Sequence, residues 1–184
     1  PVEVVATDGF LLPNAELGAR GLLHRKGFPE SYDTEAIERF LGALGRGEPG
    51  SVPLYSHQTY DVVAGGGRRI DAADAVLFEG VNALQFADRL DLAVYVDAPE
   101  DAMEAWYTLR FLELCVAPPA GSFYSQFATL DKGGVRELAR TVWCDVNLVN
   151  LRECIVPTRA NADVVIEKRP DHSIGRVLVG EEMA

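Results

Sequence analysis

The chain opens with an apolar run that ends in a turn. Residues 2–6 are apolar except for Glu3, which predicts a buried β-strand. The glycine-containing sequence at residues 7–10 stops the run and lets the backbone turn. Asp8 therefore lies just past the carboxyl end of a core strand, at the edge where open α/β sheets bind ligands. It is a candidate general base, and an Asx turn or helix cap is the structural alternative.

The same pattern recurs along the chain and alternates with helical periodicity. Further strands are predicted at residues 73–78, 90–96 and 162–167. Amphipathic helices are predicted at residues 34–46, after Pro99 and at residues 135–147. Strands that alternate with helices indicate an α/β fold with a doubly wound, mainly parallel sheet. Residues 65–67 are all glycine and predict a turn, and the last residues, from Gly180 on, predict a loose tail.

Composition narrows the class of protein. The 184 residues suffice for one domain with a sizeable core, and the formal net charge is −11. That charge argues against a nucleic-acid or anionic-membrane surface, because phosphates would be repelled. The three cysteines fit reduced thiols, and no signal peptide or bilayer-spanning run is recognised. We expect a cytoplasmic protein with no nucleic-acid or membrane partner.

Two segments before residue 61 supply candidate binding residues. Three consecutive basic residues that end at Lys26 could bind phosphate or carboxylate, although such clusters are usually solvated surface. Tyr55 and His57 alternate, so they share one face of a short strand, which suits a small polar ligand. A lone histidine is, however, more often a structural group than a catalyst.

Four further residues are singled out by their positions and spacing. Glu79 is a second carboxylate at a strand's carboxyl end, where a helix cap is the structural alternative to a role in binding. On the helix after Pro99, Tyr107 and Arg110 lie on neighbouring faces of an aromatic stripe. Such a stripe is usually core, and an arginine is not expected in it unless it reaches a partner. Asn147 lies on the last turn of the helix predicted at residues 135–147, where by itself it could be a helix-end residue.

An ordered set of motifs carries a family resemblance. The strings TDGFLLPN, HRKGFPESYD, YSHQTYD, FEGVNALQ, YVDAPED, WYTLRF and PTR resemble bacterial type I pantothenate kinase in the same order. That family belongs to the P-loop kinase group, with uridine kinase and phosphoribulokinase, and the resemblance runs from Val2 to Arg176. The family's G-x-x-x-x-G-K-[ST] loop precedes the TDGF strand and does not occur in these 184 residues. We therefore expect residues 1–184 to be the C-terminal part of a single kinase domain, without its first strand and P-loop helix.

The resemblance implies a reaction and assigns roles to residues. The reaction is ATP-dependent phosphorylation of pantothenate to 4'-phosphopantothenate with Mg²⁺, the first step of coenzyme A biosynthesis. Asp8 would accept the hydroxyl proton, Glu79 would support Mg²⁺, and Lys26 and Arg110 would balance charge on the transferring phosphoryl group. Arg110 would contact nucleotide phosphate and His172 would lie near the adenine. The residues implied to hold pantothenate are Tyr55, His57, Tyr60, Tyr107 and Asn147. The family also implies a homodimer and coenzyme A as a feedback inhibitor.

Three other hypotheses remain open. The chain could belong to a related kinase of another hydroxyl compound such as a nucleoside, against which WYTLRF and Asn147 argue. It could be a non-catalytic module that binds pantothenate or coenzyme A. It could also be a truncated kinase without activity of its own, and the absent P-loop favours inactivity of this chain alone. The family's missing first strand would lie between the strands at residues 73–78 and 90–96.

Overall fold

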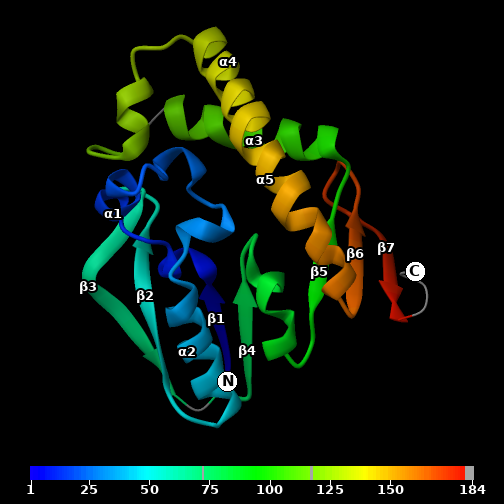
Figure 1. Ribbon diagram of the computed structural model, residues 1–184. Helices are drawn as coiled ribbons and strands as arrows, with labels where there is room; N and C mark the ends of the chain where they lie inside the picture. Colours follow the sequence, from blue (N-terminus) through cyan, green and yellow to red (C-terminus); the bar gives the residue numbers. More distant parts are fainter. Residues whose placement is uncertain (72, 117, 181–184) are drawn as a thin grey trace. The chain divides into compact units, whose positions relative to one another are not determined.

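The computed structural model describes residues 1–71, 73–116 and 118–180, and these form two compact units (Figure 1). The N-terminal unit is Pro1–Leu90 and the C-terminal unit is Asp91–Ala184. Each combines strands with helices, as the predicted α/β class requires. The predicted tail after Gly180 lies outside the described residues. No helix in the described part of the chain is both long and apolar enough to cross a membrane.

A pair of parallel strands forms the centre of the N-terminal unit. Strand β1 (Val2–Ala6) pairs with β4 (Ala75–Glu79), so the two predicted strands end side by side at their carboxyl ends. The prediction that β1 is buried on both faces is wrong, because Val2 is 69 % and Val4 53 % exposed. A run of apolar residues identifies the strand but does not tell how many of its faces are covered.

Helix α2 (Thr34–Gly45) covers the buried face of this pair. It begins as predicted, with the carboxylate of Asp33 accepting the Ala36 N–H at 2.9 Å. Its Phe40 ring lies 5.6 Å from Phe10 and 6.3 Å from Phe78, measured between ring centroids. These three aromatic rings join α2, β4 and the turn after β1 in one core. The core thus fixes the strand end that carries Asp8.

A long antiparallel hairpin completes the unit. Strand β2 (Gly50–Ser56) pairs with β3 (Asp61–Ile70), and a short helix, α1 (Asn14–Ala19), precedes them in sequence. The predicted turn at residues 65–67 is wrong, since these glycines lie within β3. The chain reverses earlier, at residues 57–60, where Tyr60 adopts a φ of 56°. Composition alone did not reveal that the turn uses a tyrosine instead of a glycine.

Gly80 follows β4 and allows a close approach to Thr7. It has a φ of 147°, and a Cβ at this position would overlap the buried Thr7 hydroxyl. We therefore expect Gly80→Ala to lower the free energy of unfolding by about 1–3 kcal/mol, as overpacking does. Urea unfolding followed by circular dichroism measures the change.

Gly45→Ala is the matched control for this substitution. Gly45 lies in the last turn of α2, and a Cβ there meets no atom within 4 Å. Alanine should be neutral or slightly stabilising at that position, because it is the better helix former. Equal unfolding free energies for the Gly80→Ala and Gly45→Ala chains would refute the tight contact between Gly80 and Thr7.

The C-terminal unit contains a three-stranded mixed sheet. Strand β5 (Val94–Asp97) pairs in parallel with β6 (Val164–Lys168), and β7 (Ile174–Val179) lies antiparallel on the other side of β6. The third predicted strand begins at Val94, because residues 83–89 form a 3-10 segment that Leu90 ends. Strand β7 was not predicted from the sequence.

Helices complete the C-terminal unit. They are α3 (Glu100–Val116), a 3-10 turn at Phe123–Phe127, and α4 (Lys132–Val142). After α4 the helix continues through a wide π-helical turn, Trp143–Asn147, then α5 (Leu148–Asn150) and a second π-helical turn, Leu151–Ile155. Figure 1 shows α4 and α5 following each other as one continuous rod. The predicted helix at residues 135–147 is thus the first part of a longer helix.

Candidate functional site

Asp8 lies in a short 3-10 turn, Thr7–Phe10, directly after β1. Its side chain is 38 % exposed, and its carboxylate Oδ2 lies 4.0 Å from Nε2 of His57. The next residue, Gly9, packs so closely on β2 that an added Cβ would overlap the Pro53 carbonyl oxygen. The close packing at Gly9 holds the turn, while the Asp8 carboxylate still reaches solvent. A fixed, accessible carboxylate at a strand end can accept a proton from a bound hydroxyl group.

Two hydrogen bonds hold the ammonium of Lys26, on which the Asp8 carboxylate also acts electrostatically. Its Nζ donates hydrogen bonds to Oδ1 of Asn14 and to the carbonyl oxygen of Tyr60, both at 2.6 Å. Burial lowers the pKa of the Lys26 ammonium, while the nearby carboxylates of Asp61 and Asp8 favour its charged form. The basic loop that the sequence presents as possible surface therefore contributes a half-buried cation to the site.

Aromatic rings surround the Lys26 ammonium. Its Nζ lies 4.3 Å from the ring centroid of Tyr60 and 5.1 Å from that of Tyr55. The Tyr55 ring in turn meets the ring of His57 edge-on, with centroids 5.1 Å apart. The structure thus brings together five residues that the sequence singled out, namely Asp8, Lys26, Tyr55, His57 and Tyr60.

Three polar residues of this site were missed by sequence reasoning. Asn14 contacts Lys26 as described, and Tyr32 and Asn82 are buried beside the turn. Burial raises the pKa of Tyr32 to about 12, and the negative charge of Asp8 acts in the same direction. Asn82 donates from Nδ2 to the carbonyl oxygen of Gly27 at 2.7 Å, which ties the loop next to Lys26 to the end of β4. The only indication of these three residues in the sequence is that they lie within the motifs TDGFLLPN, GFPESYD and FEGVNALQ.

Glu79 is the last residue of β4 and lies opposite Ala6 in register. Its side chain is exposed, and no hydrogen bond or ion pair joins its carboxylate to another described residue. Because Ala6 immediately precedes the turn that carries Asp8, two carboxylates follow neighbouring strand ends. Glu79 is not the cap of the next helical segment, because the N-cap of the 3-10 segment at residues 83–89 is Asn82.

Helix α3 carries the two candidates of the WYTLRF motif. Tyr107 packs in an aromatic cluster, with ring centroids 5.9 Å from Phe111 and 5.8 Å from Trp143. Arg110 is exposed and lies near Tyr124, whose pKa burial raises and the Arg110 charge lowers. The stripe is therefore core, as such stripes usually are, while Arg110 lies outside that core.

The other candidates of the C-terminal unit differ in their surroundings. Asn147 is half-buried and ends the first π-helical turn, a type of helix defect that is frequent at functional sites. His172 has a φ of 67°, and its ring stacks on Trp106 with centroids 4.1 Å apart. The Trp106 indole N–H also donates to the Pro170 carbonyl at 3.0 Å, which fixes the turn that carries His172.

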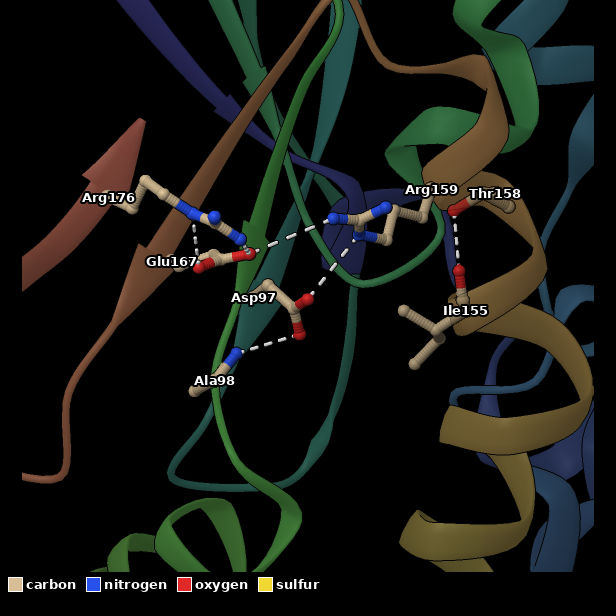
Figure 2. Close-up of polar contacts among 7 residues, drawn as sticks. All are labelled: Asp97, Ala98, Ile155, Thr158, Arg159, Glu167 and Arg176. Carbon is tan, nitrogen blue, oxygen red and sulfur yellow. Dashed lines mark hydrogen bonds and ion pairs between the residues drawn. The ribbon is translucent and has the colours of Figure 1, made fainter. Parts of the chain in front are cut away.

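Figure 2 shows a network of charges at the carboxyl ends of β5 and β6. Asp97 lies opposite Glu167 in the parallel register, so two like charges are neighbours across the sheet. Arg159 of the PTR motif lies 3.4 Å from Asp97 and 3.9 Å from Glu167, and Arg176 donates twice to Glu167. The hydrogen bonds from Arg176 lower the pKa of Glu167. Asp97 is thus a strand-end carboxylate already engaged by an arginine.

Comparisons with known proteins agree with the motifs. Curated pantothenate kinases match almost the whole chain, at 43 % identity over 97 % of it in Chelativorans sp. and 45 % over 96 % in Sorangium cellulosum. A pantothenate kinase of Streptococcus pneumoniae is 41 % identical over 97 % of the chain. The chain resembles pantothenate kinases. Each of these pantothenate kinases is matched over 61 % of its own length, so the chain spans about three fifths of the relatives. No family model matches it.

Solved structures agree with the predicted fold. A D-glycerate 3-kinase from Cryptococcus neoformans superposes with a TM-score of 0.69, over 97 % of this chain and 80 % of that chain, at 13 % identity. Phosphoribulokinase from Rhodobacter spheroides gives a TM-score of 0.62 over 91 % of this chain and 60 % of that chain, at 15 % identity. The predicted α/β fold of the P-loop kinase type is therefore confirmed.

Proposed function

We propose that these residues are the C-terminal part of a kinase domain that phosphorylates pantothenate with ATP, giving 4'-phosphopantothenate for coenzyme A biosynthesis. The observation that carries the proposal is the Asp8–Lys26 arrangement, in which a carboxylate on the turn after β1 acts electrostatically on a half-buried ammonium that two hydrogen bonds hold. The identity of 41–45 % to curated pantothenate kinases supports the choice of substrate.

In this proposal Asp8 is the general base. Its carboxylate accepts the proton as the pantothenate hydroxyl oxygen attacks the terminal phosphorus of ATP. The ammonium of Lys26 balances negative charge on the transferring group, a role that needs a fixed cation in a partly desolvated site. Pantothenate, the acceptor, is held by Tyr55, His57 and Tyr60. The ring of Tyr55 contacts the rings of both other residues, so the three side chains form one cluster.

The residues present fit a magnesium ion bound with its nucleotide. Glu79 offers an exposed carboxylate that no described residue engages, and oxygen ligands are what Mg²⁺ prefers. No cluster of three or more His, Cys, Asp or Glu side chains in the described ranges could hold a metal by itself. Such sparse protein ligation is usual for Mg²⁺, which keeps water and substrate phosphates as ligands. When bound, the ion would neutralise charge on the phosphates of ATP.

The C-terminal unit contributes further roles. Arg110 contacts phosphate oxygens, which its exposed guanidinium can reach without leaving a core. Tyr107 and Asn147 bind pantothenate, and His172 contacts the adenine of ATP. The stack of His172 on Trp106 gives that imidazole one fixed orientation, which supports a role in binding a planar base. We further propose that the whole enzyme is a cytoplasmic homodimer that coenzyme A inhibits.

Two variants test this proposal when the nucleotide-binding segment of a curated pantothenate kinase is joined ahead of these residues. Arg110→Ala should lower turnover of pantothenate about 10²-fold or more with little change in binding, because it removes charge stabilisation. Tyr107→Phe should chiefly weaken pantothenate binding, because it removes one hydroxyl and keeps the ring that packs on Phe111 and Trp143. Steady-state kinetics and calorimetric titration separate the two effects.

A substrate panel and a control complete this test. Arg136→Ala removes another exposed arginine and should change neither quantity. Phosphorylation of uridine in preference to pantothenate by the joined chain would favour the nucleoside kinase. Pantothenate binding without any turnover would favour a non-catalytic module. Equal losses of stability and activity in both variants would mean that Tyr107 and Arg110 serve packing only.

A further inference from the structure

Asn14 makes three hydrogen bonds to two separate segments. Its backbone N–H donates to Oδ1 of Asp61 at 2.9 Å, and its side-chain Nδ2 donates to the Tyr60 carbonyl oxygen at 2.9 Å. Its Oδ1 accepts from Nζ of Lys26 at 2.6 Å. The ammonium can only donate and the carbonyl can only accept, so these partners fix which way the amide faces. One side chain thus links the loop of Lys26 to the turn between β2 and β3.

The Tyr60 carbonyl oxygen receives both of these donors. Tyr60 lies in the left-handed region with a φ of 56°, which is uncommon for a residue other than glycine. Such a conformation persists only where the surroundings hold it. Here the amide of Asn14 and the ammonium of Lys26 both donate to the carbonyl oxygen of this residue. The turn, the amide and the ammonium therefore stabilise one another.

The same hydrogen bonds determine which N–H donors of Lys26 remain available to a ligand. An ammonium carries three N–H donors, and the bonds to Asn14 and Tyr60 use two of them. The third donor remains for an anionic oxygen of a ligand. A lysine is normally a flexible point charge, so fixing two donors makes the direction of the third specific.

We propose that Asn14 is a positioning residue that holds the ammonium of Lys26 in place for a phosphate or carboxylate oxygen of the ligand. This inference rests on the proposed function, in which Lys26 contacts the transferring group. Asn14 itself touches neither substrate nor phosphate. It acts by fixing the cation before the ligand arrives, so that binding need not order the lysine side chain.

Two substitutions of Asn14 should shift the pKa of Lys26 in opposite directions. Asn14→Asp replaces the amide by a carboxylate at hydrogen-bond distance, which should raise the pKa of Lys26 by about one to three pH units. Asn14→Leu removes the acceptor and leaves the ammonium half-buried, which should lower its pKa further. Carbon-13 labelling of the lysine ε-carbon lets NMR follow both, because the 184 residues contain three lysines and Lys132 and Lys168 serve as internal references.

Ligand titrations with these variants test the positioning itself. With pantothenate and with inorganic phosphate as probes, Asn14→Asp should weaken binding about tenfold or more, because the added charge neutralises the cation. Asn161→Leu is the matched control, since Asn161 is an exposed amide of the C-terminal unit. Thermal melting shows whether each variant is folded. If the Asn14→Leu chain is unfolded, the pKa of Lys26 in the Asn14→Asp chain decides whether Asn14 controls the ammonium.

The outcomes separate this inference from the proposed function. An unchanged Lys26 pKa in a folded Asn14→Asp chain would overturn the role of Asn14, whatever the chain binds. A shifted pKa together with unchanged phosphate affinity would also overturn it. A parent chain that does not bind pantothenate would refute the proposed substrate, while the NMR titration of Lys26 would still decide whether Asn14 controls the ammonium.

Discussion

Asp8→Asn is expected to lower turnover about 10²- to 10⁴-fold in a chain that also carries the nucleotide-binding segment. The substitution keeps the size of the side chain and removes the group that accepts the hydroxyl proton. Pantothenate affinity should stay within about twofold, because the substitution should leave the fold intact. The Asp8 side chain makes no described hydrogen bond, and its carboxylate only approaches Nε2 of His57 at 4.0 Å. Steady-state turnover, with binding measured by calorimetry, separates the two quantities.

A second aspartate serves as the control for this substitution. Asp91 is exposed and lies in no proposed site, so Asp91→Asn should leave both turnover and binding unchanged. The unfolding transition of each variant shows that the fold survives. Wild-type turnover in the Asp8→Asn chain would rule out Asp8 as the base and would leave it the structural role of a turn residue.

The second large effect concerns the 184 residues by themselves. We predict no measurable ATP-dependent phosphorylation of pantothenate by this chain alone, because its sequence contains no G-x-x-x-x-G-K-[ST] loop to cradle the phosphates and no Walker lysine to contact them. Joining the nucleotide-binding segment of a curated pantothenate kinase should restore turnover. An assay of ADP release with both proteins at high purity measures the difference.

The sheets suggest how the isolated chain should behave in that assay. Among the described residues β4 pairs with β1 alone, and β5 pairs with β6 alone, so each has one strand edge without a neighbour in its sheet. Apolar side chains such as Val2 and Leu77 are also exposed. Unprotected apolar edges favour association, so light scattering should rise with concentration for the isolated chain and less for the joined one. Activity from a monodisperse isolated chain would contradict the prediction and would require a different phosphate site.

The structure brings together candidate residues of the N-terminal unit whose positions follow from local order along the chain. A stiff strand places Asp8 at its end, and alternation places Tyr55 and His57 on one face. Sequence reasoning could not predict Asn14 or Asn82, because their roles depend on contacts with residues 12 to 55 positions away. Such contacts leave no periodic signal in a single sequence.

Errors in strand assignment show a second limit of prediction from the sequence. Strand β7 was missed because its apolar residues are mostly exposed and it follows a tight turn. The glycines within β3 were mistaken for a turn because composition does not distinguish an extended glycine from a turning one. Trp106 lies in the WYTLRF motif without being a candidate, since its stack on His172 depends on a turn beyond residue 168.

The wide turns of the long helix determine where Asn147 faces. A row of residues at intervals of four runs along this helix, and all of them but Asn147 are buried: Val135, Ala139, Trp143, Asn147 and Leu151. In a regular α-helix each such step advances about 40° too far, so the row would wind nearly halfway around the rod over its length. A π-helical turn holds more residues per turn and cancels part of that drift. Removing one residue between Trp143 and Leu151, other than Asn147, would turn Asn147 out of line with Trp143 or Leu151, although every side chain in the row would still be present.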